Sequence, residues 1–240
     1  MFLVPIGGGG LISGISSYLK EKNKNIKIYG VEPEGAASMF FSIKNKKIIA
    51  LDKVDTFCDG VAVKKVGELT FKLTQKYVDD IIVVPEGHVA IKMIDIFQNE
   101  GIILEPAGAL SIAALDFIKN QIKNKTIICI LSGGNNDLLR YPEILEKSLI
   151  YQGRKHYFLI NFAQKPGQLK NFVNNVLGAN DDIVLFEYIK KNNKEKGPAL
   201  VGIELEKKED FKKITNNLKR YQFDYQIINP NDLIYKFLID

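Results

Sequence analysis

The sequence predicts an α/β protein in two parts: a parallel sheet covered by helices on both faces, then a smaller ferredoxin-like α+β domain. Three observations support this prediction. Up to about residue 140, short apolar segments alternate with segments whose apolar residues recur at helical spacing. These short segments are apolar throughout, which is typical of parallel strands buried on both faces. After about residue 155 the expected order becomes βαββαβ, the ferredoxin-like pattern.

In the first part, strands are expected at residues 1–6, 27–31, 80–84 and 126–131. Helices are expected directly after the first strand, at 89–99 and from 105 onward, where Glu105-Pro106-Ala107-Gly108 opens a helix. A strand that begins at residue 1 needs neighbours on both sides to be a central strand. We therefore expect a segment upstream of this chain, which would then be the C-terminal portion of a larger domain.

In the second part, Tyr141-Pro142 is expected to interrupt the pattern, and the polar stretch 149–155 is expected to be a linker. This places the two domains at residues 1–150 and 155–240. Within the second domain, strands are expected at 156–162, 183–189, 199–205 and 225–228, with helices at 167–177 and 208–221. The Lys- and Asn-rich segment 190–197 is expected to be an exposed hairpin.

Composition excludes several classes of function. Of 240 residues, 46% are apolar and 25% charged, as in ordinary globular proteins. The net charge of +5 comes from interleaved Lys and Glu rather than from a basic face, so no nucleic-acid partner is expected. No apolar run reaches the roughly 20 residues of a membrane helix, so no membrane partner is expected either. Two widely separated cysteines, Cys58 and Cys129, suggest neither a disulfide framework nor a metal site and fit a cytoplasmic protein.

Four consecutive glycines, Gly7 to Gly10, lie between an expected strand and an expected helix. Backbone amides in such a loop can approach an anion at the positive end of the helix dipole, so we expect a phosphate cradle. A merely flexible turn is the plainer alternative. A dinucleotide fingerprint is another, because Glu32 ends the next strand, where a ribose-binding acid would lie. Its spacing fits badly, since Ser13 occupies the place of the third glycine.

A second small polar cluster, Ser132-Gly133-Gly134-Asn135, also follows an apolar strand. The carboxyl ends of strands in a doubly wound sheet face one crevice, so the two loops are expected to grip one compact ligand. An ordinary turn is the alternative for this cluster taken alone, because turns favour these residues.

Several phrases of this sequence resemble those of fold type II pyridoxal-phosphate enzymes, the threonine and serine dehydratases. Five phrases occur in the family's order: 4–11 (Val-Pro-Ile-Gly-Gly-Gly-Gly-Leu), 30–33 (Gly-Val-Glu-Pro), 59–63 (Asp-Gly-Val-Ala-Val), 105–109 (Glu-Pro-Ala-Gly-Ala) and 131–135 (Leu-Ser-Gly-Gly-Asn). The tail resembles the shorter biosynthetic threonine dehydratases in particular, through residues 151–158, 166–169, 186–188, 191–195 and 197–202. The resemblance covers essentially the whole chain.

This resemblance implies a role for each motif. The amides of Gly7, Gly8, Gly9, Gly10 and Leu11 would hold the phosphate of pyridoxal 5′-phosphate. Ser132 Oγ would hydrogen-bond the pyridine nitrogen, and a neutral partner there moderates the ring's electron-withdrawing power in a way that suits elimination of a β-hydroxyl. Glu105 would line the cofactor side of the pocket, or else serve as a charge at the start of the next helix.

The sequence departs from the family in two respects. The family's Schiff-base lysine lies in an N-terminal Ser-x-Lys-x-Arg motif, which is absent here, and adjacent Lys64 and Lys65 are expected to be solvated rather than nucleophilic. We therefore expect this chain alone to be catalytically silent and to bind cofactor weakly at best. No metal is expected, because Ser38 occupies the place of an acid that would assist Glu32, and His88 and His156 lie in different domains.

For the complete enzyme, the resemblance implies deamination of L-threonine to 2-oxobutanoate and ammonia, in isoleucine biosynthesis. Residues 155–240 would form an ACT-like regulatory module that binds isoleucine or valine near Gly167, Gln168 and Leu169, where amides at a helix start can receive a carboxylate. Dimerisation alone is the alternative role of this module. A homo-oligomer, or pairing of the open sheet with a missing N-terminal half, is also expected. Two other classes remain open: a nucleotide-binding oxidoreductase or transferase, and a non-catalytic regulatory or assembly fragment.

Overall fold

The computed structural model describes residues 1–188, 196–230, 232, 234 and 235. The chain divides into two compact units, Met1–Leu145 and Glu146–Asp240, which are described separately. The α/β fold class is confirmed in both its parts: a parallel sheet in the first unit and a ferredoxin-like sheet in the second.

The first unit contains a parallel sheet with the strand order β3-β2-β1-β4. Its strands are β1 (Phe2–Pro5), β2 (Ile28–Pro33), β3 (Asp80–Val84) and β4 (Ile128–Cys129). The prediction of a strand over 126–131 is wrong in length, because β4 has only two residues. Within the described residues β4 pairs only with β1, and Ile128 and Leu131 are each 42% exposed. With one neighbouring strand, the apolar run is not buried on both sides.

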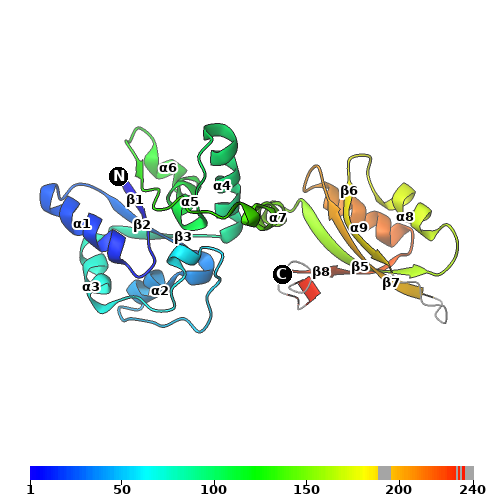
Figure 1. The fold of residues 1–240 in the computed structure, drawn as a ribbon, viewed down its shortest axis with the longest axis horizontal. Helices are drawn as coiled ribbons and strands as arrows, with labels where there is room; N and C mark the ends of the chain where they lie inside the picture. The colour runs from blue at the N-terminus through cyan, green and yellow to red at the C-terminus, as the bar shows by residue number, and fades with distance from the viewer. Residues whose placement is uncertain (189–195, 231, 233, 236–240) are drawn as a thin grey trace. The chain divides into compact units, whose positions relative to one another are not determined.

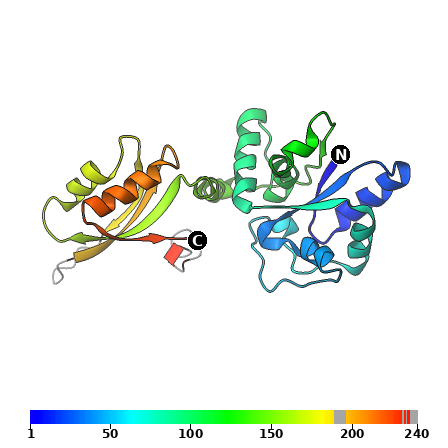
Figure 2. The ribbon, with the colours of Figure 1, turned by 180° about the vertical axis from the view of Figure 1, so that it is seen from behind.

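Helices cover both faces of this sheet, as Figure 1 and the reverse view in Figure 2 show. Side chains of adjacent strand residues point to opposite faces, so Leu3 packs in one core cluster with α4 and α5, and Val4 packs in the other with α1, α2 and α3. The helices are α1 (Gly10–Lys22), α2 (Ser38–Lys44), α3 (Glu68–Tyr77), α4 (Glu86–Glu100), α5 (Pro106–Ala113) and α6 (Lys119–Ile122), with 3₁₀ turns η1 (Glu34–Ala36), η2 (Asp59–Val61), η3 (Ala114–Phe117) and η4 (Leu138–Arg140).

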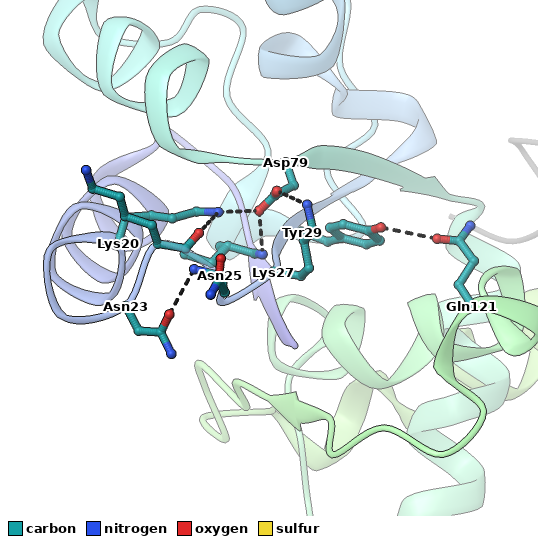
Figure 3. A network of polar contacts seen from close by, with 9 residues as sticks. Lys20, Asn23, Asn25, Lys27, Tyr29, Asp79 and Gln121 are labelled. Atoms are coloured by element: carbon teal, nitrogen blue, oxygen red, sulfur yellow. Dashed lines mark hydrogen bonds and ion pairs between the residues drawn. The ribbon is translucent and has the colours of Figure 1, made fainter.

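A network around Asp79 joins elements at the amino ends of β2 and β3 (Figure 3). Its carboxylate accepts hydrogen bonds from Lys20 and Lys27, each at 2.8 Å, and from the backbone N–H of Ile28 at 2.9 Å. Burial acts to raise the pKa of Asp79, but these donors outweigh it and hold that pKa below its ordinary value. Figure 3 also shows the Tyr29 hydroxyl donating to Gln121 at 3.2 Å. The amino ends of the strands are thus held by polar contacts, and their carboxyl ends carry the glycine loops.

The segment at 141–155 differs from its prediction. Tyr141 and Pro142 begin helix α7 (Tyr141–Tyr151) instead of interrupting the chain. Proline is well tolerated in a first helical turn, where its missing N–H has no partner to lose. Residues 149–151, predicted as linker, are the last residues of α7, and Gly153, just after the helix, has a φ of +68°. Only 152–154 separate α7 from the next strand.

The second unit has the predicted βαββαβ order and an antiparallel sheet with the strand order β6-β7-β5-β8. Its helices lie side by side on one face of the sheet (Figures 1 and 2), where Phe158, Phe162 and Phe172 fill the core. The elements are β5 (Lys155–Ala163), α8 (Gln168–Val176), β6 (Asp182–Tyr188), β7 (Lys196–Glu204), α9 (Asp210–Arg220) and β8 (Asp224–Ile228). Most of the predicted hairpin 190–197, and Ile189 of the predicted strand, lie outside the described residues.

Candidate functional site

The glycine run Gly7–Gly10 connects the end of β1 to the first turn of α1. Gly9 is the N-cap of α1 and has a φ of +90°, a backbone conformation that favours glycine. A Cβ at this position would lie 2.7 Å from Met39 Cε and 2.8 Å from Thr70 Cβ. The loop therefore has neither the backbone conformation nor the space for a side chain at its centre.

The amides of this loop have no partner within the described part of the chain. The first backbone donor after the glycines is Ser13, whose N–H binds the Gly9 carbonyl at 3.0 Å, and no hydrogen bond is donated by the amides of residues 7–12 to a described residue. These amides lie at the positive end of the α1 dipole, where an anion is stabilised. An arrangement of this kind can hold a phosphate group.

The loop that begins at Ser132 is held against the first turn of α5. The carbonyl oxygen of Gly133 accepts a hydrogen bond from the Glu105 N–H at 3.3 Å, and a Cβ on Gly108 would lie only 2.1 Å from that oxygen. Ser132 Oγ donates to the Ala107 carbonyl at 3.4 Å. Backbone contact between the loop and the helix thus fixes the position of the Ser132 hydroxyl.

These two loops line one pocket of about 240 Å³. The structure therefore brings together all the residues that the sequence predicts for the cofactor site, together with four other apolar or small residues. The lining comprises Pro5, Gly7, Gly8, Gly9, Gly10, Leu11, Gly60, Val61, Glu105, Ala107 and Ser132.

The Glu105 carboxylate lies inside this pocket. Glu105 is the N-cap of α5, yet its side chain makes no capping hydrogen bond to that helix. Its Oε1 atom would be 3.2 Å from a Cβ on Gly60 and 1.9 Å from a Cβ on Gly133, so the carboxylate lies between these two glycines. This position favours the pocket-lining role over that of a helix charge.

Sequence reasoning assigned no role to Gly60, Val61 and Thr70. Gly60 and Val61 belong to the quoted phrase 59–63, and turn η2 places them opposite the glycine run. A Cβ on Gly7 would lie 3.0 Å from Val61 Cα, which shows how closely the two backbones approach. Thr70 lies on α3, where a single threonine in a helix gives no signal of a contact with a distant loop.

Glu32 does not occupy the position of a ribose-binding acid. Its side chain is fully buried, and its two carboxylate oxygens accept the backbone N–H groups of Met39 at 2.8 Å and Phe40 at 2.6 Å. Burial raises the pKa of Glu32 to about 8, and the two N–H donors oppose part of this rise. The acid is thus engaged with the start of α2, and this removes the main support for the dinucleotide interpretation.

A pH-dependent stability is expected from Glu32. A folded-state pKa of about 8, above the ordinary 4.5, means that the folded chain keeps this proton while the unfolded chain releases it. The stabilising contribution is therefore full below about pH 4.5 and is lost as pH rises toward 8. Urea unfolding of the native chain and Glu32→Gln should show their difference in unfolding free energy shifting by a few kcal/mol, at most about 4, between pH 5 and pH 8. An equal difference at both pH values would contradict this.

The structure also places the residues for which the sequence predicts no catalytic or metal-binding role. Lys64 and Lys65 are both exposed. Ser38 is buried at the start of α2, and within the described ranges no group of three or more His, Cys, Asp or Glu side chains could hold a metal ion. In the same part of the chain, every helix is too short or too polar to cross a membrane.

The predicted effector residues belong to the second unit. Gly167 is the N-cap of α8 with a φ of +85°, and its carbonyl accepts the Asn171 N–H at 2.9 Å. Leu169 in the first turn of α8 is 48% exposed, and Val173 one turn later is 41% exposed. The N-terminus of α8 thus has no side-chain cap, and the exposed apolar side chains of Leu169 and Val173 follow it on the helix.

A parallel sheet with an amide-lined loop and a neutral hydroxyl in one pocket is the arrangement expected of a pyridoxal-phosphate-dependent enzyme. The chain belongs to this family: residues 1–133 match the family described as "Pyridoxal-phosphate dependent enzyme". Residues 146–238 match the C-terminal regulatory domain of threonine dehydratase. The pocket fits the family's cofactor, because the amides of its glycine loop donate to no residue in the described part of the chain and are thus free to bind a phosphate.

Among curated proteins, the chain is similar to biosynthetic L-threonine dehydratases. The chain is 50% identical over 234 residues to the biosynthetic L-threonine dehydratase of Halalkalibacterium halodurans and 49% identical over 234 residues to that of Bacillus subtilis. Each match covers 98% of this chain and 56% of the relative, so the chain spans little more than half the length of these proteins.

The solved structures that resemble this chain include a threonine deaminase and a serine racemase. The processed form of threonine deaminase isoform 2 from Solanum lycopersicum matches with a TM-score of 0.59 and 40% identity, over 61% of this chain and 43% of that one. Maize serine racemase matches with a TM-score of 0.55 and 36% identity, over 62% of this chain and 47% of its own.

Proposed function

We propose that this chain forms the cofactor-phosphate side and the regulatory domain of a threonine dehydratase, which converts L-threonine to 2-oxobutanoate and ammonia. The observation that supports this most is the single pocket that joins the amides of Gly7–Leu11 with the Ser132 hydroxyl. In this proposal, residues 1–150 belong to the catalytic domain and 155–240 form the regulatory one. The protein would act in the cytoplasm, in isoleucine biosynthesis.

The chain's own residues would divide the work of binding. The amides of residues 7–11 would bind and orient the phosphate, and the Ser132 hydroxyl would meet the ring nitrogen. Glu105 would line the cofactor side of the pocket. When bound, pyridoxal phosphate supplies an electron sink for removal of the Cα proton and loss of the β-hydroxyl. A neutral hydroxyl at the ring nitrogen leaves that sink moderate, which suits elimination.

The proposed activity can be tested after the part of the enzyme that this chain does not span is added. The chain is fused to the segment of the Bacillus subtilis relative that the match leaves uncovered, loaded with pyridoxal phosphate, and assayed for 2-oxobutanoate with L-threonine. We expect activity from the fusion, and activity lower by roughly 10-fold or more after Ser132→Ala, because the ring nitrogen loses its partner. A folded, cofactor-loaded fusion that produces no 2-oxobutanoate would refute the proposed activity.

Regulation is the second element of the proposal. The start of α8 would bind the carboxylate of isoleucine or valine through its amides, with Leu169 and Val173 beside the ligand's apolar side chain. Calorimetry of the full chain should detect isoleucine binding, and Gly167→Val should weaken it at least about 10-fold, because a β-branched residue is strained at a φ of +85°. Asn174→Ala, an exposed change one turn further along α8, is the control. Absence of heat with both amino acids at millimolar concentration would leave only a dimerisation role.

A further inference from the structure

We propose that Thr70 is a positioning residue for the phosphate cradle, which aims the N–H of Gly9 at the bound phosphate. This inference rests on the proposed function, because it requires that residues 7–11 bind the cofactor phosphate. Thr70 itself is separate from the pocket lining and acts through the backbone of the loop.

The contact that supports the proposal is a hydrogen bond between distant segments. Thr70 Oγ1 donates to the carbonyl oxygen of Gly8 at 2.7 Å. The Thr70 carbonyl oxygen in turn accepts a hydrogen bond from Ser13 Oγ, near the start of α1, at 3.3 Å. The first turn of α3 is therefore bonded both to the glycine loop and to the helix that follows it.

Because the peptide group is rigid, the hydrogen bond from Thr70 to the Gly8 oxygen sets the direction of the Gly9 N–H. The peptide group between Gly8 and Gly9 is planar and trans, so its C=O and N–H point in opposite directions. Fixing the Gly8 oxygen on Thr70 consequently directs the Gly9 N–H away from α3. Gly9 lines the pocket, and its N–H donates to no described residue. The bond to Thr70 therefore selects the peptide orientation that serves an anion.

A run of four glycines needs such an anchor. Glycine adopts positive and negative φ with similar ease, so an unanchored glycine peptide can rotate and present its carbonyl oxygen to the anion instead. The Thr70 side chain also packs beneath the loop, since a Cβ on Gly9 would lie 2.8 Å from Thr70 Cβ. Thr70 Oγ1 is also 3.0 Å from the carbonyl of Gly67, but one hydroxyl proton serves one acceptor fully, and the Gly8 contact is the shorter.

The experiment follows the Gly9 amide directly. The full chain, labelled with ¹⁵N-glycine, is titrated with 4′-deoxypyridoxine 5′-phosphate, which carries the phosphate but has no aldehyde to react with lysines. In the native chain we expect the Gly9 resonance to shift on binding. Thr70→Val should weaken binding about 5-fold and reduce the Gly9 shift, because a neutral hydrogen bond is worth roughly a few-fold in affinity. Thr70→Ser, which keeps the hydroxyl, should restore both.

Thr74→Val is the matched control. Thr74 lies one turn further along α3, and its buried hydroxyl has no hydrogen-bond partner among the described residues, so affinity should not change. Should Thr70→Val fail to fold, Thr70→Ala provides the same comparison without a larger side chain. A folded valine or alanine variant with native affinity and a native Gly9 shift would overturn the positioning role while leaving the proposed function intact. No phosphate-dependent binding in the native chain would overturn the cradle and this role together.

Discussion

Replacing Gly108 with alanine is expected to destabilise the first unit by about 2–4 kcal/mol, although alanine favours helices more than glycine does. The new Cβ would lie 2.1 Å from the Gly133 carbonyl oxygen, a backbone atom that cannot move without displacing the loop. The Ser132 hydroxyl would move with it, so affinity for the cofactor should fall as well. Urea unfolding of the full chain measures the stability change.

Gly14→Ala is the matched control for this prediction. Gly14 is also inside a helix, but a Cβ there meets no atom within 4 Å. This variant should therefore gain up to about 1 kcal/mol from helix propensity alone. If Gly108→Ala behaved like Gly14→Ala, the close approach of α5 to the Ser132 loop would be wrong.

Replacing Gly9 with alanine should cost a similar 2–4 kcal/mol and should abolish phosphate binding. Two effects add at this position: a φ of +90°, and a Cβ within 2.9 Å of both Met39 and Thr70. The loop can accept the methyl group only by changing its backbone, and this would turn the amides away from the anion. Unfolding in urea and titration with a phosphate-bearing ligand report the two effects separately.

Gly101→Ala separates the backbone effect from the packing effect. Gly101 ends α4 with a φ of +67°, and a Cβ there meets nothing within 4 Å. This variant should lose only about 1 kcal/mol, the cost of a left-handed alanine, and should bind phosphate normally. A loss at Gly9 no larger than the loss at Gly101 would show that the loop is more accommodating than its contacts indicate.

Much of the candidate site could be predicted because its signals are local. A glycine run between a strand and a helix leaves little choice but a tight loop with free amides, and Ser132-Gly133 after a strand gives the same signal. Glu105 needed the structure, because its two roles differ only in where the carboxylate points. Thr70 could not be predicted, since its role depends on how α3 packs against α1.

The errors in the fold prediction also come from contacts between elements that are distant in the sequence. Residues 126–131 are apolar enough for a long strand, but strand length depends on neighbouring strands, which local sequence does not contain. Tyr141-Pro142 reads equally well as an interruption or as a helix start, and the helical residues that follow decide between them. Glu32 at the end of β2 satisfied the ribose pattern, but its burial and its bonds to Met39 and Phe40 depend on the position of α2.

Thermal unfolding of the same chain with three ligands distinguishes the two kinds of site. If the glycine loop and Ser132 form a pyridoxal-phosphate site rather than a dinucleotide site, the ligands should differ in their effect on the melting temperature. Thermal unfolding is measured with millimolar 4′-deoxypyridoxine 5′-phosphate, with its phosphate-free analogue and with NAD. We predict that only the phosphate-bearing pyridoxine raises the melting temperature, because a ligand stabilises the folded state that binds it. A rise with NAD and none with the pyridoxine phosphate would contradict the account.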